Sequence, residues 1–261
     1  MFEELLADIP VAGIFVLFAL VGLLFYELGY ILGRWYQNRT PEEREGPTGM
    51  IVGAILALMA FLLAITMGMA TDRYDARRGN VMAEANAIGT AYLRADYLPE
   101  PARSQSRDLL AEYAALRVAP EDVDEVRARV AASNQKLNEL WSIASALAVS
   151  DPNSPLLALY VDALNSTIDV ASVRAYDGIS VRVPNTVLLL LFVGSVMTLG
   201  MVGLSAGLTG HRSLMTAAAM IIVLGAVITL IIDIDRPREG TVTVNQAPIE
   251  QVAEQLNPPA D

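Results

Sequence analysis

The chain has 261 residues, of which 54% are hydrophobic and 18% charged, below the roughly 25% charged residues of a typical soluble domain. It has no cysteine and one histidine, His211, which excludes a disulfide framework, a thiolate metal site and a metal centre built on several imidazoles. The formal charge of −11 argues against a nucleic-acid partner. No phosphate loop, nucleophile elbow or zinc-protease motif occurs, so we expect neither an enzyme nor a cofactor.

Four apolar segments are long enough to cross a bilayer, which takes about 20 residues. They are residues 11–33, 50–70, 186–209 and 214–232. None has the polar face that a soluble amphipathic helix shows every 3.6 residues, so all four are predicted to be transmembrane helices. Residues 1–10 carry acidic rather than basic side chains, so the first segment is expected to be a span and not a cleaved signal peptide.

Between the second and third spans lies the only large polar segment. Its apolar residues recur at helical spacing, and Ser154–Pro155 predicts an N-cap followed by proline at the first helical position. One helix is expected to continue from the second span over 72–98, and another to continue from 154–182 into the third span. The fold class is therefore an all-α integral membrane protein with four spans and a helical insertion.

This pattern divides the chain into four parts. Residues 1–71 hold the first two spans and a short external loop, 72–184 form a helical domain, 185–232 hold the last two spans, and 233–261 form a tail. Arginines near the span ends number seven on the side of the termini and insertion (Arg73, Arg77, Arg78, Arg174, Arg182, Arg236 and Arg238) and four on the other (Arg34, Arg39, Arg44 and Arg212). The excess predicts cytoplasmic termini and a cytoplasmic 72–184 domain in an inner membrane.

The segment after the second span carries a distinctive run of polar residues. Asp72, Arg73, Tyr74, Arg78 and Asn86 resemble the membrane-exit motif of the bestrophin-like membrane protein family, which is distantly related to bestrophin ion channels. Thr71, Asp75 and Ala76 depart from that motif. The end of the fourth span, from Asp233 to Gly240, also resembles this family, as does the order of four spans with an insertion after the second.

The resemblance implies a homo-oligomer, expected to be a pentamer, with an axial pore lined by the second span. Bestrophin pores are narrowed by rings of large apolar side chains one helical turn apart, and Ala57, Phe61 and Ile65 fall at the matching positions. Their spacing of four residues places them on one helix face. Phe61 and Ile65 would form a constriction that closes by dewetting, whereas Ala57 would form a weak ring. The alternative is that all three face lipid or a neighbouring helix.

Small residues recur every three or four positions on two spans. The second span has Gly53, Ala57, Ala60, Ala64 and Gly68, and the third has Gly200, Gly203, Gly207 and Gly210. Small side chains allow helices to approach closely in lipid, either within one subunit or between subunits. Ala57 cannot serve both a close helix contact and an open pore face.

Three acidic residues near the membrane are candidate ion contacts. Glu27 lies inside the first apolar run, where a carboxylate must face protein, water or a cation, or be protonated. Asp233 and Asp235 end the fourth span beside Arg236, so either mutual neutralisation or a cation site is open.

The first interpretation is thus an ion channel whose partners are the lipid bilayer, further copies of the chain and inorganic ions. The alternative is a non-conducting membrane sensor or scaffold that docks other proteins through residues 72–183. The two differ in whether the Phe61 face converges on a symmetry axis.

Overall fold

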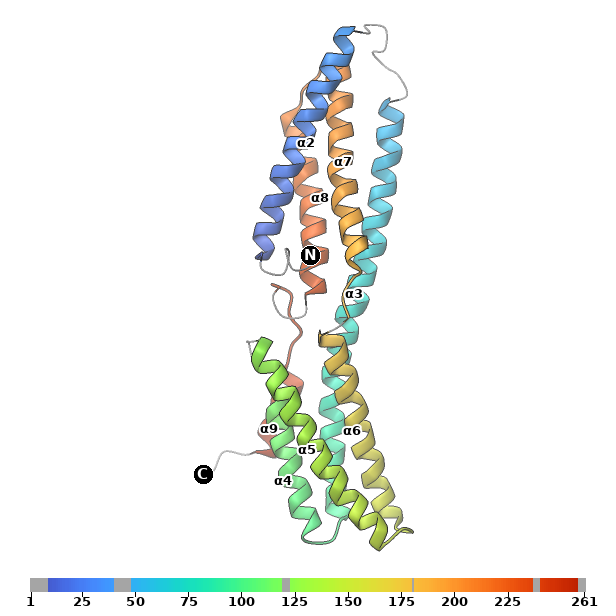
Figure 1. Cartoon of the computed structure of the whole chain (residues 1–261), viewed down its shortest axis with the longest axis vertical. Coiled ribbons are helices and arrows are strands. Elements are labelled where there is room, and N and C mark those ends of the chain that lie inside the picture. Colours follow the sequence, from blue (N-terminus) through green and yellow to red (C-terminus); the bar gives the residue numbers. More distant parts are fainter. Residues whose placement is uncertain (1–8, 40–47, 119–122, 180, 237–239, 258–261) are drawn as a thin grey trace. The chain divides into compact units, whose positions relative to one another are not determined.

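The computed structural model describes residues 9–39, 48–118, 123–179, 181–236 and 240–257, and every regular element in them is helical (Figure 1). The elements are α2 (Val11–Arg39), α3 (Thr48–Arg94), a 3-10 turn (Ala95–Tyr97), α4 (Ala102–Arg117), α5 (Val123–Ser150), α6 (Pro155–Ile179), α7 (Asn185–Thr209), α8 (Leu214–Asp235) and α9 (Ala247–Leu256). The acidic residues of 1–8, Arg44 and Arg238 lie outside the described residues.

Helices α2, α7, α8 and the first part of α3 coincide with the four predicted spans. Within the described residues, a fifth helix, α6, is also long and apolar enough to cross a membrane, although it is the least apolar of the five. The helical class is therefore confirmed, and the number of membrane crossings remains a prediction.

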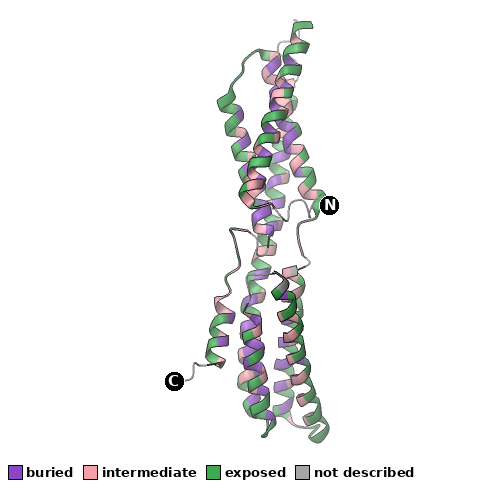
Figure 2. Ribbon diagram, turned by 60° about the vertical axis from the view of Figure 1, so that its left-hand side comes forward, coloured by how far each residue is buried: buried purple, intermediate pink, exposed green. Residues whose placement is uncertain are grey.

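The chain forms two compact units. The first contains Met1–Tyr74 and Arg182–Thr243, and so includes α2, α7, α8 and the beginning of α3. Its core is mostly apolar and includes an edge-to-face contact between Phe18 and Phe192, whose ring centroids are 5.6 Å apart. Buried positions recur along one side of each helix, and exposed positions follow the other (Figure 2).

Backbone contact between α2 and α7 is the tightest packing in the first unit. A Cβ added to Gly29 would overlap the carbonyl oxygen of Gly200, and one added to Gly203 would overlap that of Tyr26. The predicted role of the glycines on the third span in close approach is therefore confirmed, and the neighbour is a helix of the same chain.

The second unit contains Asp75–Val181 and Val244–Asp261, hence the rest of α3 together with α4, α5, α6 and α9. Its core is built around fully buried Leu110, Leu140 and Leu164. Helix α9 packs on α4: Ile249 is completely buried, and the Asn257 side-chain amide donates to the Ala111 carbonyl at 3.0 Å.

Local signals predicted some helix ends and missed others. The Ser154 cap is confirmed, because α6 begins at Pro155 and the Leu157 N–H donates to Ser154 Oγ at 3.3 Å. The expected continuation of 154–182 into the third span is wrong: α6 ends at Ile179 and α7 begins at Asn185. Pro184, at the N-cap of α7, disfavours helical geometry at Val183 and lacks the N–H that a continuous helix would use. The tail also contains α9, which was not predicted.

Candidate functional site

One face of α3 is exposed along its apolar part. Phe61 is 61% exposed and Ile65 47% exposed, and Ala57 is exposed on the turn before them. Large apolar side chains at this exposure need a cover of lipid, another helix or a narrow apolar passage. A Cβ added at Gly68, on the same face, would meet no atom within 4 Å, so this face has no partner within the described part of the chain.

The opposite face of α3 is packed within the first unit. Its buried residues are Val52, Met59, Leu63, Thr66 and Ala70. Met59 reaches α7, where its sulfur would lie 2.9 Å from a Cβ placed on Gly194. The orientation of α3 is thus fixed by its buried face, and this leaves the Phe61 face directed away from α7.

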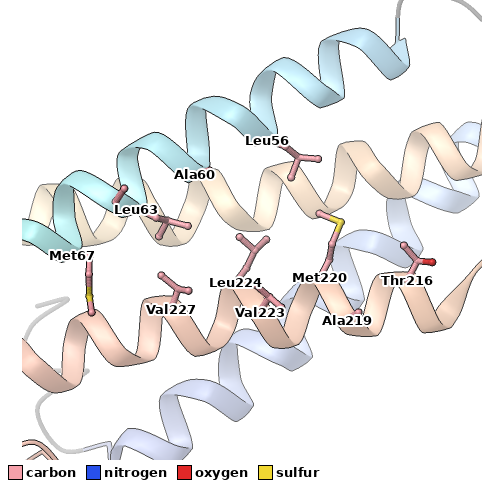
Figure 3. A pocket seen from close by; sticks show the side chains of 11 residues that line it. Leu56, Ala60, Leu63, Met67, Thr216, Ala219, Met220, Val223, Leu224 and Val227 are labelled. Carbon is pink, nitrogen blue, oxygen red and sulfur yellow. The ribbon is translucent and has the colours of Figure 1, made fainter.

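Beside the Phe61 face, α3 and α8 enclose a groove of about 710 Å³ (Figure 3). Its walls are Leu56, Ala60, Leu63, Ala64 and Met67 on α3 and Thr216, Ala219, Met220, Val223, Leu224 and Val227 on α8. Thr216 supplies the only side-chain polar group among these lining residues. Such a groove can accept apolar chains or side chains but cannot coordinate an ion.

The residues of the exit motif are distributed around α3 and do not converge on one site. Asp72 and Asn86 are exposed, Tyr74 is half-buried, and Arg78 is exposed on another side of the helix. Arg73 is half-buried, and its Nη1 donates back to the Met69 carbonyl at 3.4 Å. A conventional binding site with several ligands is therefore not formed by this motif.

Asn86 instead borders a small polar groove of about 210 Å³ between α3 and α6 in the second unit. The groove includes the exposed ion pair between Arg94 and Asp162, with an N–O distance of 3.0 Å, and the Ser166 side chain. Arg94 also donates to the Leu159 carbonyl at 2.7 Å, so its guanidinium joins α3 to α6.

A buried charge network in the second unit was missed by sequence reasoning. Glu84 on α3 is fully buried and accepts from Arg117 on α4 at 2.6 Å and from Arg174 on α6 at 2.5 Å. Tyr113 donates its hydroxyl to the same carboxylate at 2.6 Å, and Arg174 also donates to Gln246, next to α9, at 2.7 Å. One carboxylate therefore joins three helices and, through Arg174, the C-terminal segment.

This network determines the ionisation of its members. Burial alone would raise the pKa of Glu84, but the charges and hydrogen bonds of Arg117 and Arg174 outweigh it and hold the pKa below its ordinary value. Burial, with the neighbouring Glu84 charge, raises the pKa of Tyr113. A sequence signal for the buried acid does exist: Glu84 lies on the same helix face as Val81 and Ile88, which are three residues before it and four after it.

Glu27 is paired within the chain. Its carboxylate accepts from Arg212, in the turn between α7 and α8, at 2.6 Å, and the Arg212 guanidinium lies 5.4 Å from the centre of the Tyr30 ring. The pair meets the requirement for a partner that its apolar surroundings impose. A role of Glu27 as an ion contact remains a prediction.

Asp233 and Asp235 are both buried at the end of α8, and each binds a segment outside that helix. Both carboxylate oxygens of Asp235 accept from the Val183 N–H, at 2.9 and 3.0 Å, just before α7. Asp233 accepts from the backbone N–H and the hydroxyl of Thr241. Among the described residues, no group of three or more acidic or histidine side chains is close enough to hold a metal ion. The suggestion of a cation at these aspartates remains a prediction.

Comparisons with known proteins agree with this architecture. The model of the bestrophin-like domain matches residues 14–249. A crystal structure of a bacterial bestrophin homologue from Klebsiella pneumoniae, in a single-residue mutant, is similar with a TM-score of 0.68 and 15% identity, over 92% of this chain and 97% of that chain. A second structure of a homologue from that organism, solved by zinc phasing, gives a TM-score of 0.61 and 16% identity, over 92% and 96%. No curated protein matches the chain.

At such identities the solved structures show a shared fold, and the domain model supplies the family. Its match covers both helical units, from α2 to the beginning of α9. The chain belongs to the bestrophin-like family.

Proposed function

We propose that the chain is an ion channel, assembled as a homo-oligomer, with five copies expected, around an axial pore lined by the first part of α3. The observation that carries the proposal is the exposed face bearing Ala57, Phe61 and Ile65, since the other side of the same helix is already packed in its own subunit. Converging copies of this face would bury the side chains against a symmetry axis and form a narrow apolar constriction.

The proposed topology has four spans, with the termini and the 72–184 domain in the cytoplasm of a cell with an inner membrane. The arginine distribution favours this orientation. Although α6 is apolar enough to span, its exposed side includes Asp162 and Asp169, and charged side chains facing lipid are rare. Its buried side packs in the core of the second unit, so we assign α6 to the soluble domain.

The constriction is tested with two matched double variants of the full chain. Replacing both Phe61 and Ile65 with alanine should raise the flux of sodium or chloride into liposomes, because a wider apolar ring is more readily wetted. The control replaces Leu20 and Leu24, which are equally spaced and exposed on α2, and should leave the flux unchanged.

Native mass spectrometry in nanodiscs determines the number of copies in each variant. A five-fold assembly with faster flux in the Phe61/Ile65 variant supports the channel. A monomer or dimer, or unchanged flux in a correctly assembled variant, contradicts it and favours the sensor or scaffold that uses residues 72–183 for docking.

A further inference from the structure

The face of α3 that carries Phe61 and Ile65 ends, at the C-terminal limit of its apolar part, with the carboxylate of Asp72. From Met50 to Thr71 the helix has no charged side chain, and Asp72 is the first. Asp72 follows Ile65 by seven residues, about two helical turns, and therefore lies on the same face. It is exposed, like the two apolar residues before it.

No cation neutralises this carboxylate within the described residues. Asp72 takes part in no hydrogen bond or ion pair there, and the guanidinium of its neighbour Arg73 bonds back to the Met69 carbonyl. Helix positions three and four residues away, where an ion pair would form, hold Gly68, Met69, Asp75 and Ala76, none of which is basic. Among the residues that the structure describes, the negative charge of Asp72 is thus left uncompensated.

We propose that Asp72 determines the charge selectivity of the channel. This inference rests on the proposed function: when copies of the Phe61 face converge, their Asp72 carboxylates form a ring at the end of the apolar constriction. A ring of like charges at a narrow mouth concentrates cations and repels anions. The pore therefore passes monovalent cations in preference to chloride.

The chemistry of the ring sets the kind of selectivity. Each subunit contributes one exposed carboxylate and, within its described residues, no second ligand bonded to it. The ring discriminates by the sign of the charge, because selection among sodium, potassium and other cations needs a fixed set of oxygen ligands.

The reversal potential of the full chain in a planar bilayer, under a potassium chloride gradient, measures the ratio of cation to anion permeability. Neutralising the ring with Asp72→Asn should lower that ratio by at least about tenfold, the lower end of what focused surface charge achieves. Asp72→Glu should retain it. Asp169→Asn removes the same charge from the exposed face of α6 and should leave the ratio unchanged.

A second variant allows the charge of the ring to be changed after the channel has assembled. Because the chain has no cysteine, Asp72→Cys provides one thiol per subunit that can be modified after assembly. A positively charged methanethiosulfonate reagent should lower the cation preference, and a negatively charged one should restore it.

The possible outcomes distinguish the role of Asp72 from the proposed channel function on which it rests. An assembled wild-type protein without current contradicts the channel itself, and the ring with it. A conducting wild-type protein whose permeability ratio is insensitive to Asp72→Asn and to thiol modification overturns the role of Asp72 alone. An equal fall in Asp169→Asn also overturns it, since the effect would then come from net charge.

Discussion

Removing the carboxylate of Glu84 should destabilise the second unit far more than its single charge suggests. In Glu84→Ala, the guanidiniums of buried Arg117 and partly buried Arg174, with only 6% and 12% of their side chains exposed, lose their shared counter-charge. Breaking a buried ion pair on one side costs about 3–5 kcal/mol, and here two cations are left. The exposed pair of Arg94 and Asp162 provides a scale, since such pairs contribute about 0–1 kcal/mol.

Amide hydrogen exchange of the full chain in detergent measures this difference locally. A loss of about 3 kcal/mol corresponds to roughly hundredfold faster exchange in α4 and α6, because each 1.4 kcal/mol is a factor of ten. Asp162→Ala should change exchange by no more than about fivefold. If Glu84→Ala exchanges no faster than Asp162→Ala, the assignment of Glu84 as the shared counter-ion is refuted.

Three further outcomes follow from described contacts. Folding lowers the pKa of Glu84, so the ionised carboxylate stabilises the folded protein fully above the ordinary pKa of 4.5. This stabilisation is lost as the pH falls through the lower folded-state pKa. Thermal unfolding of Glu84→Gln should therefore depend less on pH below about 4.5 than thermal unfolding of the wild type. Gly203→Ala should destabilise the protein by about 1–3 kcal/mol in thermal unfolding, because the added Cβ meets the backbone of α2. The control Gly68→Ala should be neutral or stabilising by up to about 1 kcal/mol, because its Cβ meets no atom. Equal effects of the two substitutions would contradict the close α2–α7 contact. In a double-mutant cycle, Glu27→Gln and Arg212→Met should each destabilise the protein while their combination costs less than the sum, and strict additivity would argue against the ion pair.

Features that depend on sequence-local physics were predictable. Apolar runs of about 20 residues located α2, α7, α8 and the start of α3, and the Ser154–Pro155 pair located the start of α6. The glycines on α7 predicted close helix approach, although the sequence left open whether α2 or another subunit was the neighbour.

Features that depend on tertiary pairing were not predictable in the same way. Glu84, Arg117 and Arg174 are far apart in the chain, and nothing local specifies that their helices meet. Helix α9 left a weak signal, because Ile249, Val252, Ala253 and Leu256 have helical spacing, but the segment is only ten residues long and lies in a polar tail. Short helices obtain their stability from docking, here on α4.

The docking of α9 has a consequence for biosynthesis. The second unit is discontinuous, because Val244–Asp261 joins Asp75–Val181 only after α7 and α8 have been made. During translation, the surface of α4 that receives Ile249 and the Arg174 side chain that receives Gln246 remain uncovered while the last two predicted spans enter the membrane. The second unit is therefore completed only after α8 has been made, and a chain truncated after α8 would be left with an open core in that unit.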